Sequence, residues 1–309
     1  MLTKKILMKK YAPIFIIIAA VLWGLDGIVL RPSLYALPVP LVVFVEHALA
    51  FLILIPFLIK EFKEVKKLKK GDWGAFVWIA VFGGAIGTMA ITKALFYVDF
   101  VNLSVVILLQ KFQPLFAILL AWLVLKEKLP KKFFVWAGLA IIGGYFVTFG
   151  LAIPNLSSGE KIIAAALFSL LASFSFASST VFSKRALQKI NFRVGVYLRF
   201  GVTTLIMFLV VLGTGNISNF DQITLHQLLY FLIIVFSSGG LALFFYYYGL
   251  KFVTASVSTI CELAFPLSAI LFEYVIRGNV LSWVQWLGAI VLMYSIYRVT
   301  IIKEGKTQV

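Results

Sequence analysis

Ten apolar segments, each long enough to cross a lipid bilayer, account for most of this chain. They lie near residues 13–30, 38–59, 74–92, 101–124, 133–150, 162–182, 194–212, 226–248, 253–276 and 281–299. A helix needs about 20 mostly apolar residues to cross a bilayer, because it rises only about 1.5 Å per residue. Lipid offers no hydrogen bonds, so a spanning segment must satisfy its own backbone groups, as a helix does. The sequence therefore predicts an all-α integral membrane protein with ten transmembrane helices.

The composition excludes other common classes of protein. Charged residues make up 13% of the 309 residues, whereas soluble domains carry about 25%. The one cysteine, Cys261, leaves no internal disulfide, and the chain has two histidines and no GxxxxGK[ST] phosphate-binding loop. We therefore expect no enzymatic activity, no metal and no cofactor.

The positive charges indicate the orientation of the chain. The net charge is +16, and most of the 28 lysines and arginines lie at the two ends and in every second loop, at 60–72, 125–132 and 183–193. The alternate loops hold Arg31, Lys93, Lys161 and Arg277. Because basic loops stay on the cytoplasmic side, we expect both termini in the cytoplasm. We interpret the net positive charge as an indicator of membrane topology, and we expect no nucleic-acid partner. The short loops and the lack of a targeting signal favour a multi-pass protein of the plasma (inner) membrane.

The two halves of the chain are similar to each other. When Pro114 is aligned with Pro266, Ser104 matches Ser256 and Gln110 matches Glu262. We therefore predict two repeats, 1–150 and 151–309, with five helices each. Because five is odd, the second repeat enters the membrane from the opposite side. Two inverted five-helix repeats are typical of secondary transporters.

Four motifs relate the chain to a known family: AAVLWG at 19–24, ALFYV at 94–98, QPLFAILLAWLVLKEKL at 113–129 and WAGLAIIGG at 136–144. With these motifs the sequence resembles the EamA branch of the drug/metabolite transporter superfamily over nearly its whole length. The resemblance implies a central solute pathway between the repeats, faced by Trp23 and its counterpart Phe176. Members often have an arginine in the second span, where this chain has Glu46 and His47, while the matching position in the second half keeps Arg199.

Polar residues near the middle of two spans mark the candidate solute site. Glu262 lies one turn before Pro266, and Gln110 and Lys111 lie at the same depth before Pro114. A charged residue at the centre of a membrane helix costs about 2.5–3.5 kcal/mol on insertion scales, and a proline frees a backbone carbonyl. We therefore expect Gln110, Lys111 and Glu262 to bind solute where the two prolines break the helices. The alternative is that Lys111 and Glu262 pair and join the two halves.

Other polar residues lie nearer the ends of their spans. Glu46 and Arg199 differ in depth by about 10 Å, so we expect gating or coupling roles for them and no direct ion pair. A local bond to a helix end is the alternative. We also expect a gating or coupling role for His47, because an unperturbed histidine titrates near neutral pH; the alternative is a role in packing only. Asp26 is the fourth gating or coupling candidate, and it either lines the entrance or pairs with Arg31.

Two features are expected at the membrane surface and outside the solute site. The run Tyr246–Tyr248 suggests an aromatic belt near the end of its span. Glu127, between Lys126 and Lys128, suggests an anchor at the end of the fourth span.

These observations predict a secondary transporter that moves a small organic metabolite by alternating access. Glu262, Lys111 and the aromatic residues would suit a zwitterion, so the first choice is export of an amino acid or a related amphipathic solute. A proton is the candidate coupling ion, through Glu262 or Glu46. The alternatives are a sugar-phosphate or nucleotide exchanger, which would need clustered cations, and a passive channel. The sequence leaves the oligomeric state open.

Overall fold

The computed structural model of the chain describes residues 2–98, 104–153, 160–278 and 280–302. In these residues all regular structure is helical. Ten helical segments are long and apolar enough to span a membrane, and each overlaps one predicted span. They are Tyr11–Leu34, Val39–Lys60, Lys70–Tyr97, Val106–Leu125, Lys131–Phe149, Glu160–Leu187, Phe192–Gly213, Leu225–Phe252, Ala255–Ile276 and Trp283–Ile301.

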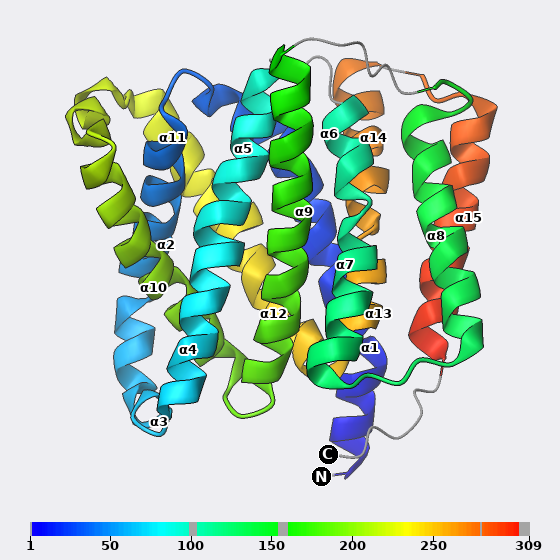
Figure 1. The fold of residues 1–309 in the computed structure, drawn as a ribbon, viewed down its shortest axis with the longest axis horizontal. Helices are drawn as coiled ribbons and strands as arrows, with labels where there is room; N and C mark the ends of the chain where they lie inside the picture. Colours follow the sequence, from blue (N-terminus) through cyan, green and yellow to red (C-terminus); the bar gives the residue numbers. More distant parts are fainter. Residues whose placement is uncertain (1, 99–103, 154–159, 279, 303–309) are drawn as a thin grey trace.

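Several spans contain more than one helix. The first half consists of α1 (Leu2–Leu25), α2 (Val39–Lys60), α3 (Phe62–Val65), α4 (Lys70–Trp78), α5 (Gly87–Tyr97), α6 (Ser104–Gln110), α7 (Gln113–Leu120) and α8 (Lys131–Phe149). The second half consists of α9 (Glu160–Leu187), α10 (Phe192–Gly213), α11 (Leu225–Ile234), α12 (Gly240–Phe252), α13 (Ala255–Cys261), α14 (Ala264–Arg277) and α15 (Trp283–Ile301). Figure 1 shows the spans side by side, with the start of α1 and the end of α15 at one face of the bundle, called here the terminal face.

The two halves pack against each other along their whole length. Extensive contacts join α1 to α12, α2 to α10, α5 to α9, α7 to α13 and α8 to α15. In span numbers these pairs are 1 with 8, 2 with 7, 3 with 6, 4 with 9 and 5 with 10. The pattern is unchanged when the two halves are exchanged, as inverted repeats require.

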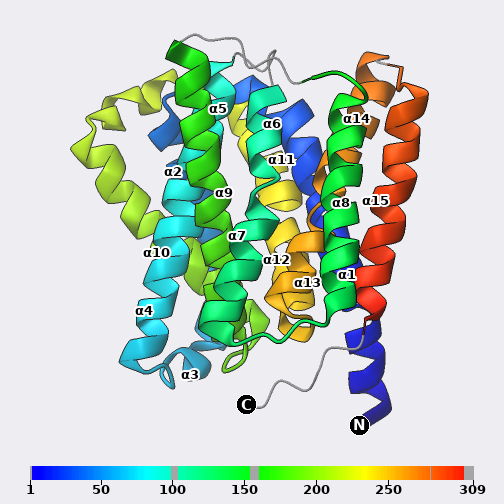
Figure 2. The same cartoon turned by 45° about the vertical axis from the view of Figure 1, so that its right-hand side comes forward.

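The pair α8 and α15 shows how closely these helices approach. A Cβ atom on Gly143 would lie 2.8 Å from the backbone nitrogen of Leu292, and one on Gly288 would lie 2.8 Å from that of Val147. Only glycine fits at these two positions, because any side chain would force the backbones apart. Both views place this pair at one edge of the bundle (Figure 2).

The outer surface of the helices is strongly apolar. Leu205 and Leu209 on α10 are 66% and 67% exposed, and Leu225 at the start of α11 is 75% exposed. A soluble protein rarely leaves large contiguous apolar surfaces in water. These leucines are therefore placed to face lipid.

Spans 4 and 9 are both broken near the middle. The fourth span stops at Gln110 and resumes at Gln113, and the ninth stops at Cys261 and resumes at Ala264. Pro114 lies in the first turn of α7, and Pro266 is the third residue of α14. Proline is tolerated in a first turn because the missing N–H would have no partner there. The breaks therefore lie one turn or less before the two prolines.

Glu127 lies in the interior and is not a surface anchor, so that prediction was wrong. It is 5% exposed, and its carboxylate accepts hydrogen bonds from the backbone N–H of Ala255 at 2.8 Å and of Ser256 at 3.2 Å. The Ser256 hydroxyl donates a third bond at 2.6 Å. The first N–H groups of a helix have no partner within it and carry partial positive charge, which attracts a carboxylate. A first-half residue thus caps α13 of the second half.

Candidate solute-binding cavity

A cavity of about 290 Å³ lies between the two halves. This volume is close to the lower end of small-molecule sites, about 300–1,000 Å³. Among the described residues, its lining comes from every span except the fifth and tenth. It includes every residue that the sequence predicted for the solute site, its helix breaks or its gates: Trp23, Asp26, Glu46, His47, Gln110, Lys111, Pro114, Phe176, Arg199, Glu262 and Pro266. Their individual roles stay predictions.

Glu262 occupies one end of the cavity, at the break in span 9. Its carboxylate accepts hydrogen bonds from Gln113 Nε2 at 2.7 Å, the Tyr246 hydroxyl at 2.9 Å and the Ser258 hydroxyl at 3.1 Å. The Thr180 hydroxyl lies 2.6 Å from that of Tyr246. Because Tyr246 gives its single proton to Glu262, Thr180 must be the donor to Tyr246. Three side chains therefore bind Glu262, and Thr180 extends this network to a fourth span through Tyr246.

Tyr246 is buried in this network, and the predicted aromatic belt was wrong for it and for Tyr247. Tyr246 is 3% exposed and Tyr247 is fully buried, and the Tyr247 hydroxyl lies 2.8 Å from that of Ser183. Consecutive helical residues point about 100° apart, so three tyrosines in a row cannot all face lipid. The run of three tyrosines in a helix could therefore have predicted that at least one of them is buried.

Lys111 occupies the corresponding break in span 4. It is 6% exposed and lines the cavity. Within the described part of the chain it has no hydrogen-bond or ion-pair partner, and a Cβ atom built on Gly144 of α8 would lie 3.8 Å from its Nζ. A direct Lys111–Glu262 ion pair is therefore absent here, since Glu262 is bound by uncharged donors.

The other end of the cavity holds a buried charge cluster around Arg31. Its Nη2 lies 2.6 Å from Asp26 Oδ2 and its Nη1 lies 3.2 Å from Glu46 Oε1. Nη1 also donates to the Thr92 hydroxyl at 3.2 Å. Arg31 thus links spans 1, 2 and 3 near the face opposite the terminal face. Asp26 both lines the cavity and pairs with Arg31, so the two alternatives weighed for it hold together.

Arg199 is held apart from this cluster. Its Nη2 donates to the backbone carbonyl of Gly83 at 3.1 Å, and its guanidinium lies 5.9 Å from the centre of the Tyr247 ring. The expected absence of a Glu46–Arg199 ion pair agrees with the described contacts, in which Glu46 pairs with Arg31.

His47 is packed in the interior. It is 7% exposed, and its Nδ1 lies 2.8 Å from the backbone carbonyl of Val43. A carbonyl only accepts, so Nδ1 carries the proton. The ring lies 5.5 Å from that of Phe200. These contacts favour a packing role, although the ring also lines the cavity.

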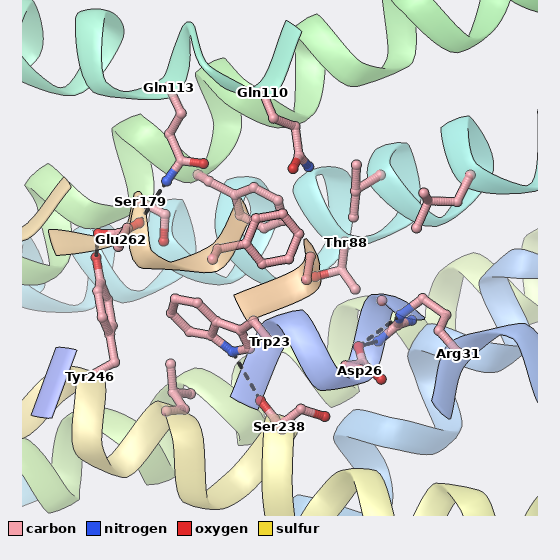
Figure 3. A pocket seen from close by; sticks show the side chains of 18 of the residues that line it. Trp23, Asp26, Arg31, Thr88, Gln110, Gln113, Ser179, Ser238, Tyr246 and Glu262 are labelled. Carbon is pink, nitrogen blue, oxygen red and sulfur yellow. Dashed lines mark hydrogen bonds and ion pairs between the residues drawn. The ribbon is translucent and has the colours of Figure 1, made fainter. Parts of the chain in front are cut away.

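Aromatic rings occupy the middle of the cavity. The Trp23 indole donates to the backbone carbonyl of Ser238 at 3.0 Å, and its ring lies 5.3 Å from that of Tyr246. Figure 3 places Trp23 between the Glu262 end and the Asp26–Arg31 end, with Gln110 on the other side of the space. Gln110 makes no hydrogen bond within the described part of the chain. The site thus offers a flat aromatic surface facing a free amide.

Several contact residues were not predicted from the sequence, among them Gln113, Thr88 and Ser238. Gln113 lies three residues after Gln110 and just before Pro114, a spacing that could have indicated it. Thr88 and Ser238 also line the cavity. Ser238 binds Trp23 through its backbone carbonyl, and no residue type indicates such a contact.

Comparison with known proteins identifies the family. The model of the EamA-like transporter family matches residues 10–149 and again residues 163–301. The chain belongs to the EamA-like transporter family. This EamA-like protein is 46% identical over 288 residues to the riboflavin transporter ImpX of Fusobacterium nucleatum, covering 93% of this chain and 96% of that one. It is 25% identical over 255 residues to the uncharacterized transporter sll1164 of Synechocystis, covering 80% and 70%.

A solved crystal structure has the same fold as this EamA-like protein. The two superpose with a TM-score of 0.72, covering 94% of this chain and 96% of the other, at 15% sequence identity. Together with the family match, these findings make the protein a multi-pass membrane transporter of a small metabolite and not an enzyme.

Proposed function

We propose that this protein carries riboflavin, or a closely related neutral flavin, across the plasma membrane by alternating access. The proposal rests above all on the cavity, which places an aromatic middle between two hydrogen-bonding ends. The similarity to a protein named as a riboflavin transporter supports it. Riboflavin has the complementary shape: a flat three-ring system with a hydrogen-bonding edge and a flexible chain of hydroxyl groups.

The aromatic residues suit the flat ring of a flavin. Trp23 is held in place by Ser238 and Tyr246, and Phe176 lines the same cavity. Aromatic side chains gain both apolar contact and favourable ring stacking with such a ligand. Gln110 offers an amide that both donates and accepts, as the carbonyl and N–H groups of the flavin edge require.

The charged residues argue against the amino-acid substrate preferred from the sequence. A zwitterion needs one available cation and one available anion. Lys111 is an available cation, but Glu262 already accepts three hydrogen bonds from the protein, and Asp26 and Glu46 are paired with Arg31, so these carboxylates are already engaged. A neutral solute avoids competing with these contacts.

The same charges disfavour phosphate-bearing substrates such as nucleotides. A phosphate is bound best by clustered cations. Arg31 is neutralised by two carboxylates, and Arg199 is bound to a backbone carbonyl. Lys111 alone is unpaired among the described cations of the cavity, and one cation is a poor match for a dianion.

Orientation, direction and coupling belong to the same proposal. The basic loops support a cytoplasmic terminal face, and then the Asp26–Arg31 end of the cavity is nearer the outside. A proton is the proposed coupling ion, with Glu262 and Glu46 as its candidate carriers. Net flux, whether export or import, then follows the combined gradients of solute and ion.

The test is counterflow in proteoliposomes that contain the purified protein. Vesicles are preloaded with unlabelled riboflavin, and entry of labelled riboflavin is followed; separate batches are preloaded with amino acids and tested with labelled amino acids. We expect saturable exchange for riboflavin alone, and none in protein-free vesicles. Exchange of amino acids but not riboflavin by folded protein would restore the first substrate choice. Flux without acceleration by preloading would indicate a channel.

A further inference from the structure

The charge cluster at Asp26, Arg31 and Glu46 contains one carboxylate more than it can pair. The side chains of Arg31, Asp26 and Glu46 are only 9%, 12% and 8% exposed. One guanidinium faces two carboxylates, so the fully ionised cluster carries a net negative charge out of water. Removing an uncompensated charge from water is costly. One further positive charge would balance the cluster.

The two carboxylates are not held equally. Asp26 Oδ2 accepts from both Nη2 and Nε of Arg31, at 2.6 Å and 2.9 Å. Glu46 lies farther from the same guanidinium, at 3.2 Å from Nη1 and 3.5 Å from Nη2. The Arg31–Asp26 pair is thus the tighter ion pair. Glu46 would lose less ion-pair energy than Asp26 if it were protonated.

The cluster also contains buried carboxylate oxygens that accept no hydrogen bond. Asp26 Oδ1 is buried and has no hydrogen-bond donor within the described part of the chain, and the same is true of Glu46 Oε1, whose contact with Arg31 is an ion pair at 3.2 Å. A buried acceptor without a donor costs about 1–3 kcal/mol. A proton added to the cluster supplies a donor. A metal cation is a poorer match, since the described residues contain no group of three or more His, Cys, Asp or Glu side chains able to hold one.

Within the described residues, no other charged group forms an ion pair with Asp26 or Glu46. His47, next to Glu46 on α2, is bonded to Val43. Arg199 on α10 is bonded to the backbone carbonyl of Gly83, and Lys111 lines the same cavity without an ion pair to either carboxylate. Lys93 on α5 is exposed, and so are His226 on α11 and Asp221 before it.

We infer that Glu46, held by Arg31 beside Asp26, is the proton-binding site that couples solute movement to the proton gradient. The inference rests on the proposed function and selects Glu46 over Glu262, whose lone pairs are occupied by three donors. Protonation of Glu46 removes its ion pair with Arg31 and leaves Arg31 on Asp26. Because Arg31 joins spans 1, 2 and 3 through Asp26, Glu46 and Thr92, the proton loosens span 2 from this link at the face opposite the termini.

The test measures how many protons move with each riboflavin. Proteoliposomes are loaded with a pH dye whose emission is distinct from that of riboflavin, and a riboflavin gradient is imposed without a pH gradient. The variants are Glu46→Gln, Asp26→Asn and, as a matched control, Glu64→Gln, whose partner Lys67 lies on the surface. Solute flux and proton flux are recorded together, so that the result is a ratio and does not depend on the rate of transport.

We expect about one proton per riboflavin in the wild type and in Glu64→Gln, and at least a tenfold lower ratio in Glu46→Gln. Asp26→Asn also removes one negative charge from the cluster and should lower the ratio in the same way, which keeps the test valid if Glu46→Gln does not fold. An unchanged ratio in both folded variants, proton-free flux in the wild type, or flux driven by a sodium gradient in place of protons would overturn the inference. Absence of any riboflavin exchange in the wild type would instead overturn the proposed function.

Discussion

The breaks in spans 4 and 9 occupy equivalent positions in the two halves, yet their central residues are in opposite situations. Glu262 is bound by three donors from Gln113, Tyr246 and Ser258. Lys111 is more deeply buried than Glu262 and has no partner in the described part of the chain. The inverted repeats thus produce two similar helix breaks, but the side chains at the two breaks make different contacts. Glu262 is bonded to side chains of neighbouring spans, whereas Lys111 is predicted to be available to the solute.

The largest expected effect is the loss of stability on replacing Glu262, the residue whose carboxylate is bound by three donors. Glu262→Ala leaves the buried Tyr246 hydroxyl and its neighbours without an acceptor, and each unsatisfied group costs about 1–3 kcal/mol. We expect a loss of about 3 kcal/mol or more in the free energy of unfolding, measured by denaturant titration in detergent. A variant as stable as the wild type would show that the network does not hold the halves together.

The next largest effect is expected for Lys111, which has no partner in the described part of the chain, and it concerns solute binding. Lys111→Met keeps the length of the side chain and removes a costly membrane charge, so we expect unchanged or higher stability. The KM for riboflavin in counterflow should rise at least tenfold, which is about 1.4 kcal/mol of binding. Lys93→Met, at an exposed lysine, is the control. Misfolding of Lys111→Met would mean that this lysine has a structural partner after all.

Two glutamines on the same break provide a finer comparison. Gln113 donates to Glu262, so Gln113→Leu removes one of three donors. A hydrogen bond to a charged group contributes about 1.5–3 kcal/mol, and we expect a loss of stability at the lower end of this range. Thermal unfolding followed beside the wild type measures it. A larger rise in KM than loss of stability would show that Gln113 contacts the solute instead.

Gln110→Leu should have the smallest effect on the protein itself. Gln110 makes no hydrogen bond in the described part of the chain, so the melting temperature should not fall. The KM for riboflavin should rise about threefold to tenfold, as for the loss of one ligand hydrogen bond of about 1 kcal/mol. A fall in stability equal to that of Gln113→Leu would erase the distinction between the two glutamines.

The sequence was sufficient to predict the spans and the residues that line the central cavity. Membrane helices satisfy their own backbone bonds, so length and apolarity alone locate them, and the unusual Lys111, Glu262 and the two prolines mark the middle. The partners were harder to predict because they depend on packing between halves. Gln113 and Glu262 are separated by 149 residues, and Trp23 and Ser238 by 215. The tight Arg31–Asp26 pair was foreseeable as an alternative because only five residues separate the two.

The hydrogen bonds from the start of α13 to Glu127 affect whether the two repeats can fold as separate chains. The second half alone would begin this helix with the amides of Ala255 and Ser256 unpaired inside a membrane, where each unmet group costs several kcal/mol. The first half alone would carry a buried carboxylate with no donors. Each repeat is therefore an incomplete fold, and co-expression of residues 1–150 and 151–309 as separate chains should give protein only when both are present.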